Sequence, residues 1–369
     1  MKKYRGIFSM GTWGILIYIA VLLSSCQSTL THMNMDEMEV PLNAASVPAR
    51  EPFTIVLVHG LEGAPENFYR IHKTLEKVYP EATIFPLHEL DTVKQDIQSQ
   101  AKKGSVELSM RIKENALQES PLVVIGHSQG GLRANEMLQQ YGKTLTGGEK
   151  ILITISTPWL GSPMLDQEEE LSKAVTWLAN STVAKLMPVL KRVEGLKLHQ
   201  SPGIKDLKPD SYFINRLHLS LRNNNLRPAH LNATDTLVIA TSLDPESRAR
   251  RFINWVGSFY GFDTTAYLEK MHGSDKHDLL APVPSQLGEG VLKSDSDDRM
   301  VKERTVKGEI IHNTNMEGSY FTRRRLGLTG ALEHDEVIKE VIDFINGKLH
   351  IEKEINEDDF YTPDLCAIL

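Results

Sequence analysis

Short apolar runs alternate with amphipathic segments along the first half of the chain. The apolar runs have the length of buried strands and lie at residues 53–58, 83–86, 122–125 and 151–156. The segments between them, at residues 66–78 and 93–119 and after residue 128, carry apolar residues at helical spacing. This alternation predicts a mostly parallel sheet with helices on both faces, so we expect an α/β fold.

The pattern changes between residues 165 and 231. This part holds amphipathic stretches, such as residues 171–189, but no run that indicates a strand. We therefore expect a helical lid inserted at about residues 165–231, covering a site on the sheet.

Strand-like runs return at residues 236–241 and 306–311. A final amphipathic helix is predicted directly after His334, with an apolar stripe of Val337, Ile338, Val341, Ile342 and Ile345. One domain would then span residues 51–350, followed by an acidic tail at residues 351–369.

The first 26 residues have the composition of a targeting segment. Lys2, Lys3 and Arg5 precede an uncharged stretch that closes on Leu23-Ser24-Ser25-Cys26. That ending resembles a bacterial lipobox, which implies a lipid on Cys26; an uncleaved membrane anchor is the alternative.

The polar residues 27–50 would tether the domain to this anchor. We expect a membrane-anchored lipoprotein of the bacterial cell envelope, and Gln27 after the cysteine favours the outer membrane where the cell has one.

Composition narrows the class further. The 369-residue chain is 41% hydrophobic with a formal net charge of −7, which fits a globular protein and disfavours nucleic acid as a partner. Its two cysteines exclude a disulfide framework.

The strongest candidate for chemistry is Ser128, in the sequence GHSQGG after the third apolar run. Gly126 and Gly130 flank it in a G-x-S-x-G pattern between a predicted strand and a predicted helix, the context of a nucleophile elbow. Such a turn exposes the serine hydroxyl and directs the backbone N–H of Gln129 toward an oxyanion formed by attack on a carbonyl.

A second glycine-rich turn follows the first apolar run, in the sequence FTIVLVHGLEG. A strand followed by His-Gly is where such enzymes place the other oxyanion donor, and here that donor would be the N–H of Leu61. We interpret His59 as a structural residue of this loop, not as a base.

These segments resemble α/β-hydrolases of the lipase and esterase type. VHGLEGAPENF and GHSQGGL are also similar to palmitoyl-protein thioesterases, and ILITISTPWLGSP resembles the strand and loop after the elbow helix of many lipases. The resemblance implies an α/β-hydrolase fold with a serine, an acid and a histidine in that order along the chain.

Three acids are candidates for the second member. HDLLAPVPSQ resembles the lipase pattern D-G-V-V-P-V-x-S, with Asp278, Pro282 and Ser285 in register. GEGVLKSDS makes Glu289 the alternative, and Asp297 is a third. We favour Asp278 because both its proline and its serine match.

Two histidines remain for the base. His312 stands at the end of the last predicted strand, whereas His334 stands directly before the final helix. We favour His312 and keep His334 as the alternate, because Asp335 and Glu336 give His334 a plain role at a helix start.

The resemblance implies a carboxylic ester hydrolase acting on lipid or fatty-acyl esters. An acyltransferase or thioesterase of the same fold, or a non-catalytic binding lipoprotein, are the alternatives. No metal-binding motif is present, so we expect neither a metal nor a cofactor.

Overall fold

The computed structural model describes residues 52–361 except 62, 89–90, 167–200, 223–233, 249, 252–253, 255–263, 279, 293–300 and 313–328. A six-stranded sheet runs through its centre, with every adjacent pair of strands parallel. In spatial order the strands are β2 (Thr83–Pro86), β1 (Thr54–Val58), β3 (Leu122–His127), β4 (Lys150–Ile155), β5 (Asp235–Leu243) and β6 (Val301–Gly308). The predicted α/β fold, a mostly parallel sheet with helices on both faces, is confirmed.

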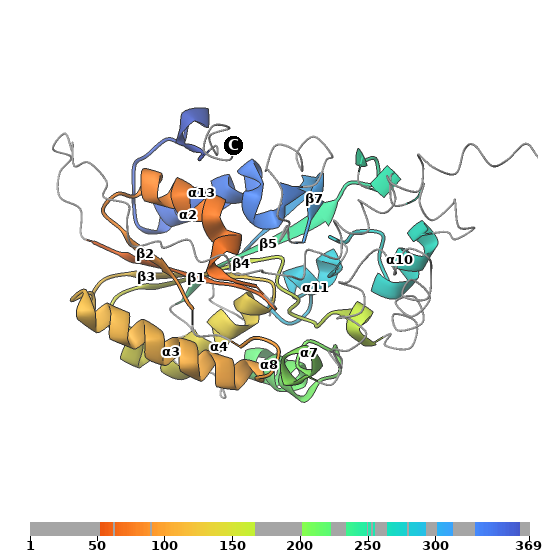
Figure 1. Ribbon diagram of the computed structural model, residues 1–369, viewed down its shortest axis with the longest axis horizontal. Helices are drawn as coiled ribbons and strands as arrows, with labels where there is room; N and C mark the ends of the chain where they lie inside the picture. The colour runs from red at the N-terminus through yellow and green to blue at the C-terminus, as the bar shows by residue number, and fades with distance from the viewer. Residues whose placement is uncertain are drawn as a thin grey trace, which may run out of the picture.

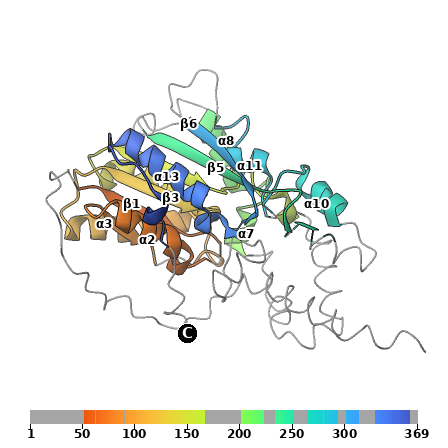
Figure 2. The ribbon, with the colours of Figure 1, turned by 90° about the horizontal axis from the view of Figure 1, so that it is seen from above.

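Helices cover both faces of this sheet (Figure 1). One layer holds α2 (Tyr69–Val78) and α13 (Asp335–Lys348), which lie over the sheet when it is viewed from above (Figure 2). The other holds α3 (Ile97–Glu114), α4 (Gln129–Leu145), α7 (Pro202–Lys205) and α8 (Tyr212–Arg222). The shorter α10 (Thr264–His272) and α11 (Val283–Leu287) lie beyond one end of the sheet.

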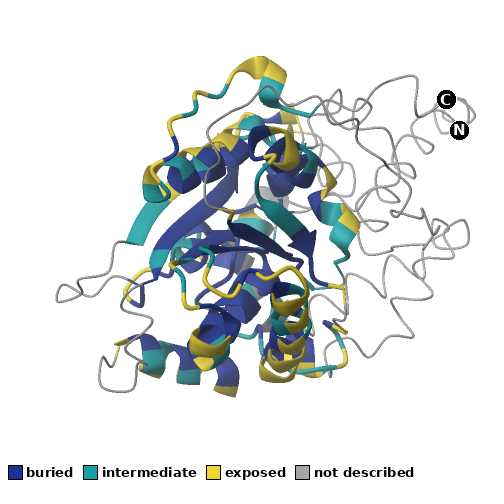
Figure 3. Ribbon diagram, turned by 90° about the vertical axis from the view of Figure 1, so that its left-hand side faces the viewer, coloured by how far each residue is buried: buried dark blue, intermediate teal, exposed yellow. Residues whose placement is uncertain are grey.

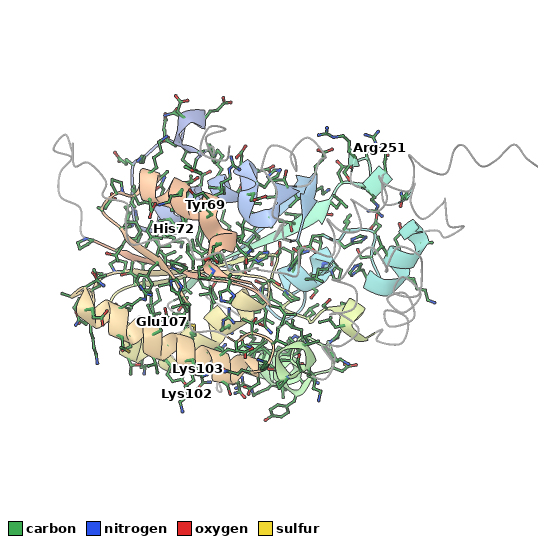
Figure 4. The ribbon with its side chains drawn as sticks, viewed as in Figure 1. Tyr69, His72, Lys102, Lys103, Glu107 and Arg251 are labelled. Carbon is green, nitrogen blue, oxygen red and sulfur yellow. The ribbon has the colours of Figure 1, made fainter. Side chains whose placement is uncertain are left out.

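Side chains alternate between the two faces of each strand, so the hydrophobic core has two parts, one on each face of the sheet. In β1, Ile55 and Leu57 pack with α2 and α13, whereas Val56 and Val58 pack with α3 and α4. This is the alternation of side chains that a strand requires when both of its faces are covered. The central strands are therefore buried (Figure 3). The helices keep exposed outer faces, including that of α3 with Lys102 and Lys103 (Figure 4).

The last strand differs from the prediction. Residues 306–311 were expected to form it, but β6 begins at Val301, and Ile310–Ile311 (β7) pairs separately with Thr329–Gly330 (β8). The start of β6, VKERT, is polar because it forms the edge of the sheet and is only partly buried. An edge strand needs no apolar run, so its first half left no hydrophobic signal.

Part of the predicted lid belongs to a helix layer. Phe213, Ile214, Leu217 and Leu221 of α8 are buried in the same core as α3 and α4. The stretch at residues 171–189, on which the lid prediction depended most, lies outside the described residues.

The beginning of the predicted acidic tail packs along α2. The Lys353 ammonium donates to the carbonyl of Val78 (2.6 Å), and the Tyr361 N–H donates to Thr74 Oγ1 (3.1 Å). Tyr361 also meets the ring of Tyr69 edge to face, and Tyr69 is the first residue of α2 (Tyr69 is labelled in Figure 4).

The predicted signal segment and tether, residues 1–50, lie outside the described residues. Across the described part of the chain, every helix is too short or too polar to cross a bilayer.

Candidate active site

Ser128 lies in a sharp turn between β3 and α4. Its backbone is in a conformation that non-glycine residues rarely adopt, with φ 55° and ψ −131°. A Cβ atom at Gly130 would collide with the carbonyl oxygens of Val58 and His59, and one at Gly131 would collide with Thr157. The turn can therefore approach β1 and β4 only because glycines follow the serine.

Three side chains that are distant in sequence meet at this turn. His312 Nε2 lies 2.7 Å from Ser128 Oγ, and His312 Nδ1 lies 2.7 Å from Asp278 Oδ2. Ser128 directly follows β3 and His312 directly follows β7, whereas Asp278 lies in the loop between α10 and α11. The N–H of Leu243, at the end of β5, donates to the carbonyl of His277 in that loop (2.9 Å), and the N–H of His312 donates to the carbonyl of Asp278 (3.1 Å). All three are buried, with Asp278 completely so.

The Asp278 carboxylate is well supplied with donors. Its Oδ1 accepts from the N–H groups of Leu280 (3.1 Å) and Ala281 (2.9 Å). Burial by itself raises the pKa of Asp278, but the neighbouring His312 and these amides outweigh it and hold that pKa below its usual value. The group is an anion at neutral pH.

The alternates lie elsewhere. His334 is the residue before α13 and packs beside Gly308, and Glu289 is exposed after α11. Neither contacts Ser128 in the described part of the chain, and Asp297 lies outside it. The structure thus brings together Ser128, Asp278 and His312 and leaves His334 and Glu289 apart.

The loop after β1 passes directly beside the serine. A Cβ atom at Gly60 would lie 2.7 Å from Ser128 Cβ and 3.2 Å from Ser128 Oγ, so only glycine fits there. Leu61 follows Gly60 directly and Gln129 follows Ser128 directly, which places both backbone amides within one residue of this contact.

His59 braces that loop from the buried side. Its Nδ1 donates to the carbonyl of Gly60 (3.0 Å), while its own carbonyl accepts from Arg133. Burial, reinforced by the positive charge of Arg133, lowers the pKa of His59 to about 3. The ring is therefore neutral and acts as a support of the loop, as the sequence interpretation held.

His127, which sequence reasoning did not single out, supports His312. It precedes the serine, is buried, and its Nε2 lies 2.8 Å from the carbonyl oxygen of His312. Burial lowers the pKa of His127 to about 3, so the ring is neutral and Nε2 carries the proton that it donates. The partner of His127 is a backbone carbonyl that is distant in sequence, so no sequence pattern indicates this contact.

Within the described residues, no three His, Cys, Asp or Glu side chains gather closely enough to hold a metal ion. The rings of His272 and His277 do stack, with their centroids 4.6 Å apart, and His277 is next to Asp278 in sequence. Both are buried, His272 at the end of α10 and His277 in the loop that carries the acid.

A family of known proteins matches the first half of the domain. Residues 51–211 match the family described as "Putative serine esterase (DUF676)", and this segment contains the loop after β1, the Ser128 turn and α4. No curated protein matches the chain.

Several solved structures are similar to this chain at low sequence identity. The lin2722 gene product of Listeria innocua is 13% identical, with a TM-score of 0.47, over 83% of this chain and 96% of that one. The mature lipase BlEst2 of Bacillus licheniformis is 18% identical, with a TM-score of 0.42, over 78% and 96%. The RedJ thioesterase of Streptomyces coelicolor is 11% identical, with a TM-score of 0.39, over 84% and 97%.

Proposed function

We propose that this α/β-hydrolase, whose residues 51–211 match a serine esterase family, hydrolyses carboxylic esters through an acyl-enzyme on Ser128. One observation carries the proposal: the His312 ring bridges the Ser128 hydroxyl and the Asp278 carboxylate at 2.7 Å on each side. A ring held in this way has one nitrogen ready to take a proton and the other fixed by an anion.

In the first half of the reaction, Ser128 Oγ attacks the ester carbonyl carbon and its proton moves to His312 Nε2. The bond to the leaving alcohol then breaks, and His312 returns the proton to that alcohol. Asp278 holds the ring so that Nδ1 carries its own hydrogen and stabilises the cation that forms. In the second half, water replaces the alcohol, and the same proton transfers release the carboxylic acid.

The tetrahedral intermediates carry a negative oxygen. The backbone amides of Leu61 and Gln129 are the donors we assign to it, because they flank the contact between Gly60 and Ser128. Loss of one such donor costs about 3 kcal/mol of transition-state stabilisation in comparable enzymes. The rigid support of this loop by His59 and Arg133 keeps its donor in place before substrate arrives.

For the substrate class we propose esters of lipids or fatty acids. The proposal is supported by the predicted lipid anchor at Cys26, which would hold the enzyme at a membrane. The same acyl-enzyme would serve a thioesterase or, with an alcohol in place of water, an acyltransferase.

The test is a series of p-nitrophenyl esters from acetate to palmitate, given to the full chain in detergent. We expect hydrolysis that rises with acyl length, and Ser128→Ala should lower kcat by about 10⁴-fold or more without changing the circular dichroism spectrum. The same assay with added glycerol tests for acyl transfer. If most of the acyl group is recovered as a glycerol ester, the protein is an acyltransferase. Equal activity of wild type and Ser128→Ala would overturn the proposal.

A further inference from the structure

The strand β4 ends at Ile155, opposite Ile239, whereas β5 continues to Leu243, whose N–H donates to the carbonyl of His277 in the acid loop. The N–H of Ser156 donates to the carbonyl of Ile239 (2.8 Å), which ends the ladder between the two strands. Ser156 then turns the chain away with φ 52°, a left-handed conformation that costs energy for a serine. Thr241, two residues beyond Ile239 on β5, has no strand on that side in the described part of the chain.

The carboxamide of Gln286 takes the place of the missing strand. Its Oε1 accepts from the Thr241 N–H (2.8 Å), and its Nε2 donates to the Thr241 carbonyl (3.0 Å). The same Nε2 donates to the carbonyl of Ala281 (2.8 Å). Because the N–H of Ala281 donates to Asp278, Gln286 fixes the end of β5 to the acid loop.

A chain of hydroxyl groups crosses the space that β4 vacates. Thr241 Oγ1 lies 3.2 Å from Asp278 Oδ2, and Ser156 Oγ lies 2.6 Å from Thr241 Oγ1. A carboxylate only accepts, so Thr241 must donate to Asp278 and has only lone pairs left for Ser156. Ser156 is therefore the donor to Thr241, and all three groups are completely buried.

We propose that Ser156 and Thr241 form a hydroxyl relay that holds the Asp278 carboxylate ionised and aimed at His312, which makes Thr241 a positioning residue of the site. The inference rests on the proposed function. The strained backbone of Ser156 serves this relay, because it brings the serine hydroxyl to the threonine at the point where the strand departs.

The relay acts on the oxygen that faces the base. Asp278 Oδ2 has two partners, His312 Nδ1 and Thr241 Oγ1, while Oδ1 is occupied by backbone amides. A donor that is itself polarised by another hydroxyl strengthens a hydrogen bond to an anion in a dry interior. Without the hydrogen bond from Thr241, the Asp278 carboxylate is more basic and binds the proton on His312 Nδ1 more tightly.

Among the described residues, three titratable rings interact electrostatically with Asp278, namely His312, His127 and His277. Burial lowers the pKa of His127 to about 3 and that of His277 to about 4, so both stay neutral above pH 5. A change in the pH profile above pH 5 therefore reports the pair of Asp278 and His312.

The test replaces Thr241 by valine, which keeps the shape of the side chain and suits a strand. We expect kcat/KM to fall about tenfold to a hundredfold, the effect of a hydrogen bond to a charged group. The midpoint of the acidic limb of its pH profile should move to higher pH. Thr241→Ser, which restores the hydroxyl, should recover both the rate and the midpoint.

Thr154 offers a matched control. It lies completely buried on β4, and its hydroxyl has no hydrogen-bond partner within the described part of the chain. Thr154→Val should leave both the rate and the pH midpoint of wild type. If Thr154→Val and Thr241→Val change the rate and the midpoint equally, the effect comes from the loss of any buried hydroxyl and the relay is overturned.

Ser156 supplies a second variant and a double-mutant cycle. Ser156→Ala keeps the backbone strain of the parent residue and should shift the midpoint in the same direction by less than Thr241→Val. Its effect should vanish in the Thr241→Val background, because the serine acts only through the threonine. Additive effects of the two substitutions would overturn the relay.

A spectroscopic readout separates this inference from the proposed function. With ¹⁵N-histidine in the protein, the His312 Nδ1–H resonance bonded to Asp278 should move in Thr241→Val and return in Thr241→Ser. If the protein hydrolyses no ester but the resonance moves and returns in this way, the proposed function is wrong and the relay still stands. An active, Ser128-dependent enzyme in which Thr241→Val leaves rate, midpoint and resonance unchanged would overturn the relay alone.

Discussion

The Nε2 atom of His312 lies 2.7 Å from the Oγ atom of Ser128, although 184 residues separate them along the chain. This short distance depends on the backbone conformation at both residues. Ser128 is raised by a turn with positive φ, and the His312 carbonyl is fixed by the neutral ring of His127. The residue that precedes the serine therefore also positions the histidine.

Gly60→Ala should inactivate the protein more than it destabilises it. The added methyl group would lie 2.7 Å from Ser128 Cβ, so either the serine or the loop that carries Leu61 must move. A displacement of this kind costs about 10²-fold in kcat when reacting groups are misplaced by an ångström. The measurement is kcat together with the urea midpoint.

Gly347→Ala is the matched control for that substitution. Gly347 lies exposed within α13, and nothing stands within 4 Å of where its Cβ would be. Alanine there should leave kcat unchanged and stabilise the helix by about 0.5–1 kcal/mol. Wild-type activity in Gly60→Ala would show that the loop does not constrain the serine.

The buried His127 should make the fold sensitive to acid. Its pKa is lowered from 6.5 to about 3 in the folded state, so the unfolded chain binds a proton that the folded chain refuses between those values. Stability should therefore fall as the pH drops below 6.5, by about 1.4 kcal/mol per pH unit from this ring. His59 should add a similar slope, because its pKa is lowered equally.

Urea unfolding of His127→Asn between pH 7 and pH 4 checks this assignment. The slope of unfolding free energy against pH should be smaller than in wild type by roughly 1 kcal/mol per unit. His350→Asn, at an exposed position after α13, should keep the wild-type slope. An unchanged slope in His127→Asn would mean that this histidine is already protonated in the folded state.

Asp278→Asn should lose about two to four decades of kcat, because an amide favours the wrong tautomer of the histidine ring. Glu289→Gln should change kcat by less than about tenfold, since Glu289 is exposed and away from His312. Ester hydrolysis by both variants at pH 8 ranks the two acids. A larger loss at Glu289 would reject the assignment of Asp278.

The anchor proposal is tested at Cys26. Cys26→Ser should block lipid attachment and leave an uncleaved precursor, because the modification needs a thiol. Membrane fractionation and mass spectrometry of the N-terminus give the answer. Wild-type protein with an intact Met1, or in the soluble fraction, would contradict the lipobox interpretation.

Local chemistry made the fold and the nucleophile predictable from the sequence. The elbow needs a strand, a serine between glycines and a helix within one short segment, and Ser128 has all of these. The buried strands β1, β3 and β4 are continuous apolar runs, which mark them without any knowledge of their neighbours.

The remaining features depend on residues that are distant in sequence. His312 directly follows the strand β7 and His334 directly precedes the helix α13, and only the three-dimensional path of the chain shows which one meets Ser128. Thr241 and Gln286 bond to backbone and side-chain atoms of other segments, so nothing in their own surroundings marks them. The polar start of β6 was missed because an edge strand needs no apolar run.

The central claim is that His312 activates Ser128, and the rate of labelling by a fluorophosphonate measures this most directly. His312→Ala should lower the second-order rate constant almost as far as Ser128→Ala, by about 10⁴-fold or more, because members of a triad act as a unit. His334→Ala should change it by less than about tenfold, since that residue lies at the start of α13. Full labelling of His312→Ala together with loss of labelling in His334→Ala would contradict the account.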